Sequence, residues 1–276
     1  MSDKFNFGRF GKYLAYDLKS HWKGNAFYLV ILALWPVVFY MIYMFFSALG
    51  QNWFSAMFSD IHLNRPPIAV RAGVFAVMTG VFLITFPSKA YGFLTQKAKG
   101  SEWIELPASR LEKFASMMLI SLIIIPAVYF CGYFLSDALV CLADKECGTS
   151  IISGWRNLHF SDDAPVTLGA NGAWGLISGT LQTVSVFLLG ALIFKKGKIL
   201  KTILALFILT MVMFAITSTV FSSIDLSAFG DKITAWFSNH VEDFDFWINF
   251  WGNVELAVVV IGLGIWSWFR VKKLQH

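Results

Sequence analysis

The sequence predicts an all-α membrane protein with six transmembrane helices and both chain ends in the cytoplasm. The first observation is composition, because 57% of the 276 residues are hydrophobic and only 14% are charged. Soluble domains average about 45–50% apolar and about 25% charged residues, so this apolar excess cannot be buried in one water-soluble core. The other two observations are six long apolar runs and the distribution of lysine and arginine among the segments that join them.

The apolar runs lie at about 26–49, 72–95, 114–141, 173–194, 199–222 and 246–269. Each reaches the roughly 20 residues that a helix needs to cross about 30 Å of hydrocarbon. Pro87 and Lys89 interrupt the inner end of the second run. Pro36 and Pro126 predict kinks in the first and third runs, or neighbours that satisfy the freed carbonyls. With no linker or short-period repeat, residues 1–276 are expected to form a single transmembrane domain, whose first run is a retained signal anchor.

Basic residues gather on one predicted side of the membrane. Of the 22 lysines and arginines, the five that fall on the other side are Arg65, Arg71, Lys145, Arg156 and Lys232. Basic residues are retained in the cytoplasm during insertion, so the richer side and both termini are predicted to be cytoplasmic. Orientation and contact with anionic membrane lipid therefore explain the net charge of +5, and no nucleic-acid partner is expected.

Residues 5–23 are predicted to form an amphipathic helix that lies on the cytoplasmic membrane surface. At helical spacing one stripe is apolar and the opposite stripe is mostly basic. The two stripes are Phe7, Phe10, Leu14, Leu18 and Trp22, and Arg9, Lys12, Tyr16, Lys19 and Lys23. Such a helix buries its apolar side at the headgroup boundary and presents cations to lipid phosphate or to a cytoplasmic partner.

The predicted outer loops carry two further features. Residues 229–241 have the apolar spacing of a short amphipathic helix, and residues 143–172 predict a long irregular loop. Cys141 and Cys147 lie where an oxidising exterior would permit a disulfide, with two free thiols as the alternative. Cys131 lies inside the third run and is predicted to be inert packing.

The most informative local segment joins the second and third runs, at residues 100–114. Pro107 is expected to open a new helix at its first turn, where a missing N–H costs nothing, which makes Leu106 the cap. Ser109 and Glu112 have the spacing of a capping box, which is the alternative start. The apolar residues among charges at 102–106 are expected to be exposed and to contact a protein partner, and an ordinary charged turn is the other interpretation.

The run from Leu106 to Phe114, with sequence LPASRLEKF, resembles the segment that follows the coupling helix in ABC-2 type transporter permeases. The six runs, the cytoplasmic termini and the N-terminal amphipathic helix agree with that family. The resemblance implies an exporter subunit in a bacterial inner membrane, paired with a second permease copy or a homologous permease and with a separate ABC ATPase. It implies that residues 97–108 dock on the ATPase. The implied coupling residues are Glu102, Trp103, Ile104, Glu105, Leu106, Pro107, Arg110 and Glu112.

Several motifs of catalytic proteins are missing from the sequence. It has no Gly-x-x-x-x-Gly-Lys-[Ser/Thr] phosphate loop, no Cys/His cluster with zinc spacing and no Gly-x-Ser-x-Gly elbow. We therefore expect a transport subunit that is not an enzyme, with no catalytic residue, no metal and no cofactor of its own. ATP and Mg²⁺ are expected on the partner subunit.

Polar residues within the runs are candidates for a substrate path. Glu255 is the carboxylate well inside a run, and Asn249 shares its helix face. An ionisable group at that depth costs about 2.5–3.5 kcal/mol, so Glu255 should face protein or water. In a functional role, Glu255 contacts a cationic or polar substrate group or carries a proton. In a structural role, it hydrogen-bonds another helix while protonated. Gln182 in the fourth run is a further path candidate, beside Gly175 and Gly179, whose spacing favours close helix packing.

Two other functions remain open at this stage. A secondary transporter could couple substrate movement to protons through Glu255, without an ATPase. A non-transporting sensor or assembly protein would instead use its outer loops.

Overall fold

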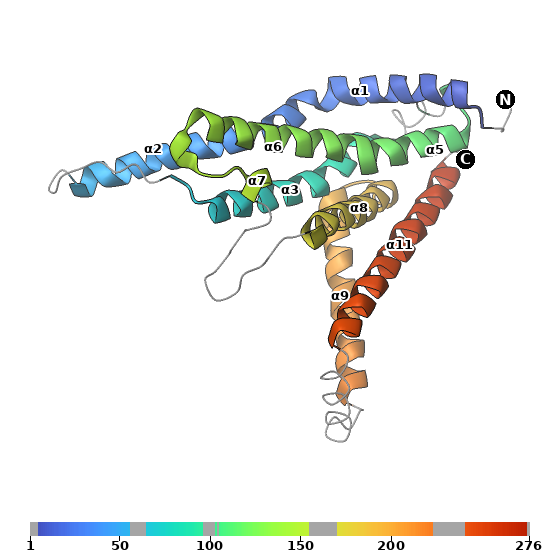
Figure 1. Cartoon of the computed structure of the whole chain (residues 1–276). Coiled ribbons are helices and arrows are strands. Elements are labelled where there is room, and N and C mark those ends of the chain that lie inside the picture. Colours follow the sequence, from blue (N-terminus) through green and yellow to red (C-terminus); the bar gives the residue numbers. More distant parts are fainter. Residues whose placement is uncertain are drawn as a thin grey trace.

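The computed structural model describes residues 5–55, 65–95, 103, 105–154, 170–222 and 241–274, and within these ranges the regular structure is entirely helical. The elements are α1 Phe7–Ala33, α2 Trp35–Ser55, α3 Ile68–Tyr91, the 3₁₀ helix η1 Gly92–Thr95, α5 Arg110–Leu119, the π-helix η2 Ile120–Ile124, α6 Ile125–Ala143, the 3₁₀ helix η3 Lys145–Cys147, α7 Ile151–Gly154, α8 Ala170–Ile193, α9 Lys198–Ser222 and α11 Val241–Leu274 (Figure 1).

Within the described residues, five helical segments are long and apolar enough to cross a membrane: Phe7–Leu49, Ile68–Thr95, Arg110–Ala143, Trp174–Ile193 and Lys198–Thr219. They match the first five predicted runs, so the chain has the character of a multi-pass membrane protein. The sixth predicted run, 246–269, lies within α11, a helix of 34 residues. Several side chains of α11 are outside the described residues, as are residues 229–240 and residues 155–169 of the predicted outer loop.

The N-terminal helix differs from its prediction. Asn6 caps α1 by accepting hydrogen bonds from the N–H groups of Gly8 and Arg9, and the helix then continues without a break to Ala33. The predicted boundary near residues 23–26 is therefore misplaced by about two turns or more, and the helix ends at Leu34 instead. Pro36 explains that position, because proline has no N–H to continue the hydrogen-bond ladder and favours the first turn of a new helix.

The face of α1 that packs against other helices is polar, and the membrane contact of the apolar stripe stays a prediction. Tyr13, Asp17 and His21 form a buried row at four-residue spacing, whereas Phe7 is 83% exposed. The reason is that α1 lies alongside the rod formed by α5, η2 and α6 (Figure 1). Polar partners on that rod and on α3 favour burial of the polar row.

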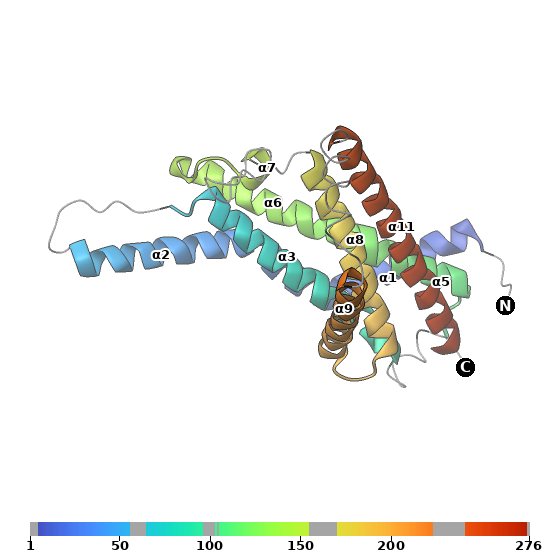
Figure 2. The same ribbon diagram turned by 90° about the horizontal axis from the view of Figure 1, so that it is seen from below.

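Aromatic side chains fill the core between α3 and α6. The rings of Phe82 and Tyr129 stack with centroids 4.2 Å apart, and Phe75 lies 5.0 Å from Tyr133. Stacked and tilted aromatic pairs of this kind add to the free energy gained from burying their area. The core fixes α3 against α6, and α8 packs between α3 and α11 (Figure 2).

Pro126 does not break the long rod. The π-helical turn η2 ends two residues before it and joins α5 to α6 without interruption. A wider π-turn accommodates a proline, because the proline ring would clash with the carbonyl of an ordinary α-turn. The proline is therefore accommodated within its own helix by the π-turn, an arrangement that the sequence did not predict.

α9 leaves the bundle and packs mainly against α8 (Figure 1). The close approach of these helices occurs at Gly190, where any added Cβ would meet Thr202, and not at Gly175 and Gly179, around which space is open. Exposed apolar side chains surround α9, and the hydroxyls of Thr210 and Thr217 donate to carbonyls of their own helix. These features are what a lipid environment requires of a helix surface.

Candidate functional site

The segment that precedes α5 starts that helix with a capping box. Ser109 is the N-cap, and its Oγ accepts a hydrogen bond from the Glu112 N–H at 3.3 Å. Glu112 Oε2 in turn accepts from the Ser109 N–H at 2.8 Å. The capping-box alternative is therefore confirmed, and the placement of Pro107 in the first helical turn is wrong, because α5 begins at Arg110.

Glu112 also reaches α1. Its Oε2 accepts from Arg9 Nε at 2.7 Å, and its Oε1 accepts from Arg9 Nη2 at 2.8 Å and from the Asn6 N–H at 2.8 Å. The carboxylate is fully buried. Asn6, Arg9, Ser109 and Glu112 form what we call the Glu112 clasp, which joins the N-terminus of α1 to the N-terminus of α5. Glu112 therefore cannot touch a partner directly, contrary to its predicted role as a docking residue.

Trp103 is buried as well, with 6% of its surface exposed, although the sequence predicted an exposed residue. Its carbonyl accepts a hydrogen bond of 2.8 Å from Lys113 Nζ, and the same ammonium group lies 5.1 Å from the ring centre. The buried ring belongs to the main hydrophobic core. Trp103 therefore anchors the segment to α5 and does not present it to a partner.

The exposed edge of this segment consists of three predicted coupling residues. Glu105, Pro107 and Arg110 are exposed, and Leu106 is half-buried. Glu102 and Ile104 lie outside the described residues. Of the predicted coupling set, the structure thus places Glu105, Pro107 and Arg110 where another protein could reach them.

Sequence reasoning missed a polar cluster around Asp17. Its Oδ2 accepts hydrogen bonds from Ser116 Oγ at 2.8 Å and from the Tyr91 hydroxyl at 3.2 Å, and its Oδ1 lies 3.3 Å from His21 Nε2. The cluster joins α1 to α3 and α5. The available signal was an acidic residue four positions from both Tyr13 and His21 on an otherwise basic helix.

A cavity of about 340 Å³ opens beside this cluster. Its walls come from one face of α1, from η1 and from the segment before α5, and the lining residues are Tyr16, Asp17, Ser20, His21, Phe93, Trp103 and Leu106. We call it the Asp17 cavity. The N-terminal helix and the predicted coupling segment therefore meet at this cavity, beside the Asp17 carboxylate.

Lys198 extends the connections to α9. Its Nζ donates hydrogen bonds to the carbonyl of Gly92 and to Thr95 Oγ1, the second at 2.6 Å. Carbonyls at the end of a helix lack intrahelical donors, and a basic side chain there satisfies them. The start of α9 is therefore fastened to η1, which leads into the coupling segment.

The predicted substrate-path residues are not brought together among the described side chains. Gln182 is exposed on α8. Asn249 and Glu255 lie on α11, and their side chains are outside the described residues, so their role stays a prediction. Among the described side chains, α8 and α11 are joined near these positions by the hydrogen bond from Trp174 Nε1 to Asn253 Oδ1.

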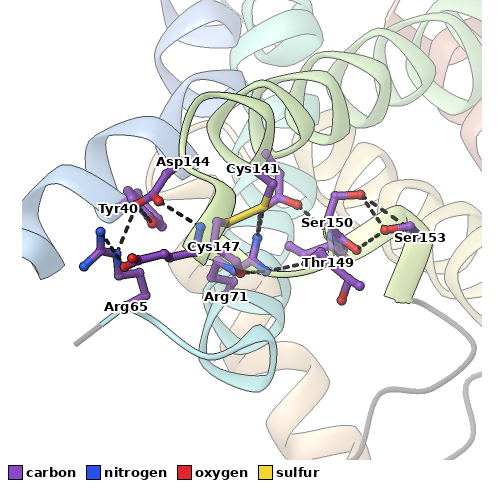
Figure 3. Close-up of a disulfide and its surroundings, with 12 residues drawn as sticks. Tyr40, Arg65, Arg71, Cys141, Asp144, Cys147, Thr149, Ser150 and Ser153 are labelled. Atoms are coloured by element: carbon purple, nitrogen blue, oxygen red, sulfur yellow. Dashed lines mark hydrogen bonds and ion pairs between the residues drawn. A yellow bond between two sulfur atoms is a disulfide. The ribbon is translucent and has the colours of Figure 1, made fainter. Parts of the chain in front are cut away.

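The opposite end of the α5–α6 rod holds a disulfide between Cys141 and Cys147, with their Cα atoms 5.1 Å apart. Arg71 of α3 lies beside it (Figure 3). Its Nη1 lies 2.9 Å from Asp137 Oδ1, and its Nη2 donates to the Thr149 carbonyl at 2.6 Å. Asp137 Oδ2 also accepts from the Ile151 N–H at 2.7 Å. These contacts fix the start of the loop after α6 against α3.

A second ion-pair group lies next to the disulfide (Figure 3). Asp144 accepts hydrogen bonds from the Tyr40 hydroxyl at 2.7 Å and from Arg65 Nε at 3.1 Å, and Arg65 also contacts Glu146. The Tyr40 hydroxyl, the Glu146 N–H and the Arg65 guanidinium lower the pKa of the Asp144 carboxyl. This carboxylate therefore stays charged under mildly acidic conditions and continues to hold α2 near the loop.

Removing the disulfide should loosen this end without unfolding the bundle. We expect the Cys141→Ser, Cys147→Ser variant to lose about 2 kcal/mol of unfolding free energy, because a short closed loop constrains the unfolded chain only moderately. A thiol titration of unreduced, denatured wild-type protein should find one free thiol, that of Cys131. Three free thiols would contradict the bridge.

The described residues contain no group of three or more His, Cys, Asp or Glu side chains that could hold a metal ion. In comparisons with known proteins, no family model, no curated protein and no solved structure matches the chain. The remaining indications of function are the sequence and the geometry at the two ends of the α5–α6 rod.

Proposed function

We propose that the chain is the membrane-spanning permease subunit of an ATP-driven exporter of the ABC-2 type, located in a bacterial inner membrane. Two such subunits would form the translocation path, and a separate ATPase would bind ATP and Mg²⁺. The apolar helices and the sorted basic residues support the membrane role, and the resemblance of residues 106–114 supports the family.

The observation that carries the proposal is how firmly the coupling segment is fastened to the helices. The Glu112 clasp holds α5 to α1, the Lys113–Trp103 bond holds the segment to α5, and Lys198 holds α9 to η1. A force applied at the exposed edge would therefore move several helices together, because packed and hydrogen-bonded elements shift as units and deform little.

In this proposal, the partner ATPase contacts Glu105, Pro107 and Arg110. Closure of the ATPase pair on binding ATP would push on that edge. Trp103 and Glu112 would act as positioning residues, since both are buried and neither reaches a partner. These two residues would transmit a displacement of the exposed edge to α1 and α5, because they hold the segment rigidly against those helices.

The test reverses two exposed charges. We expect the Glu105→Arg, Arg110→Glu variant to reduce ATPase co-purification and transport-coupled ATP hydrolysis about tenfold or more, because like charges placed across an interface repel. Glu146→Arg is the matched control, since Glu146 is exposed at the far end of the rod. The control should retain both activities.

Two results would contradict the proposal. One is the absence of any stoichiometric ATPase with the wild-type chain, which would favour the proton-coupled or non-transporting alternatives. The other is full ATPase coupling in the charge-reversed variant despite normal membrane insertion, which would remove the docking role of this edge.

A further inference from the structure

The Asp17 cavity has the chemistry of a cation site. We propose that it binds a guanidinium or alkylammonium group, carried either by a small organic molecule or by a basic side chain of a partner protein. This inference goes beyond the proposed function, and only the partner-protein source rests on it.

The first argument is the polarity of the groups that face the cavity. The Asp17 carboxylate accepts hydrogen bonds and cannot donate them, and the donors to its Oδ2 among the described residues are the neutral hydroxyls of Tyr91 and Ser116. Its Oδ1 faces only the imidazole of His21 among the described contacts. A cationic donor is the ligand that such a carboxylate would bind most strongly, because charge-assisted hydrogen bonds are the stronger ones.

The second argument is an independent one from His21. The imidazole is 7% exposed, and its Nε2 makes no hydrogen bond to the described residues although it lies 3.3 Å from Asp17 Oδ1. A buried nitrogen without a partner is costly, and one that lines a cavity is suited to a ligand that supplies the missing bond. A neutral imidazole nitrogen accepts such a bond from an N–H donor.

The third argument is the aromatic wall. Tyr16, Phe93 and Trp103 line the cavity around the carboxylate. Aromatic faces attract cations, and aromatic side chains commonly surround organic ammonium ligands. A volume of about 340 Å³ is at the lower end of small-ligand sites, so it suits a small cationic group and not a large amphiphile.

The lysines that the structure describes near the cavity do not fill this role. Lys113 is directed to the Trp103 carbonyl, and it does not line the cavity. Lys12 and Lys19 of α1 are exposed and also lie outside the lining. Arg9 is bound by Glu112 in the clasp. Among the described residues, no lysine or arginine lines the cavity, so none of them occupies the carboxylate from that side.

The experiment measures binding of agmatine, which carries both a guanidinium and an ammonium group, to the purified full-length chain by titration calorimetry. N-butylurea, a neutral molecule of similar shape, is the ligand control. We expect agmatine to bind, N-butylurea not to bind, and Asp17→Asn to weaken agmatine at least about tenfold. The Asn oxygen can still accept from Ser116 and Tyr91, so this variant should keep its fold.

Two further variants sharpen the test. His21→Leu should also weaken agmatine, because it removes the second acceptor, whereas Glu146→Gln at the far end should bind as the wild type does. If agmatine fails to bind, or binds Asp17→Asn and wild type equally, the proposal is overturned.

The source of the cation is distinguished by a photo-crosslinker at position 20, on the cavity rim. A crosslink to the ATPase that agmatine suppresses identifies a basic side chain of the partner. Agmatine binding without such a crosslink identifies a free organic cation. Because the agmatine titration uses the isolated chain, failure of the proposed exporter function would leave its result unaffected.

Discussion

The Asp137→Ala variant should unfold with a free energy about 3–5 kcal/mol below that of the wild type. The substitution leaves the Arg71 guanidinium, whose side chain is 5% exposed, buried beside no carboxylate. It also removes the acceptor of the Ile151 N–H. Breaking one member of a buried ion pair costs more than the pair contributes, because the remaining charge stays desolvated. Denaturant unfolding in detergent, followed by circular dichroism, measures the loss.

A double-mutant cycle with Arg71→Met separates the pair from its surroundings. We expect a coupling energy of at least about 2 kcal/mol between the two positions, since they are in direct contact. Glu146→Gln is the control and should change stability by less than about 0.5 kcal/mol, because Glu146 is 71% exposed. Additive effects of the two substitutions would show that Arg71 and Asp137 do not interact.

The second large effect is expected at Glu112. We expect Glu112→Ala to lower the unfolding free energy by about 2–4 kcal/mol, because the Asn6 and Ser109 N–H groups and the Arg9 side chain lose their acceptor together. The Arg9 side chain is 32% exposed and can be hydrated after the substitution, so the expected loss of unfolding free energy is smaller than for a fully buried pair. Thermal unfolding in detergent measures this loss.

The same variant tests the positioning role of the clasp. At a temperature where the Glu112→Ala protein remains folded, ATPase binding should persist while transport-coupled hydrolysis falls, because the docking edge is intact and its connection to α1 is lost. Arg9→Met should reproduce this separation. Glu105→Ala, on the exposed edge, should instead weaken binding with little change in stability. Equal loss of binding and coupling in Glu112→Ala would argue for a merely structural residue.

The course of the helices was largely predictable, and its exceptions have physical causes. Apolar runs predicted both ends of four segments to within about four residues, and the end of the first segment, because burial in lipid depends mainly on the local sequence. The boundary within 7–33 was misplaced because Gly24 weakens a helix only slightly, whereas Pro36 interrupts it. The start of α5 had two candidates, and the Ser109–Glu112 capping box prevailed because Glu112 also bonds Arg9 and Asn6.

The candidate site was only partly predictable. The sequence predicted that residues 102–106 are exposed, and the family resemblance added Arg110 and Glu112 to the coupling set. The structure divides them, since Trp103 and Glu112 are buried and Glu105 and Arg110 are exposed. No local pattern distinguishes the buried residues from the exposed ones. Trp103 is held by Lys113, which lies ten residues further along the chain, and Glu112 is held by Arg9 near the N-terminus.

The sequence by itself determined that this is an all-helical membrane protein, and it predicted which side each loop faces, because hydrophobic length and basic charge act residue by residue during insertion. Only the tertiary structure decided which polar residues meet. Arg9 and Glu112 are 103 positions apart, and Asp17 and Ser116 are 99 apart. Such pairs are selected by packing of whole helices, where a buried polar group must find a partner, and no spacing along the chain encodes that choice.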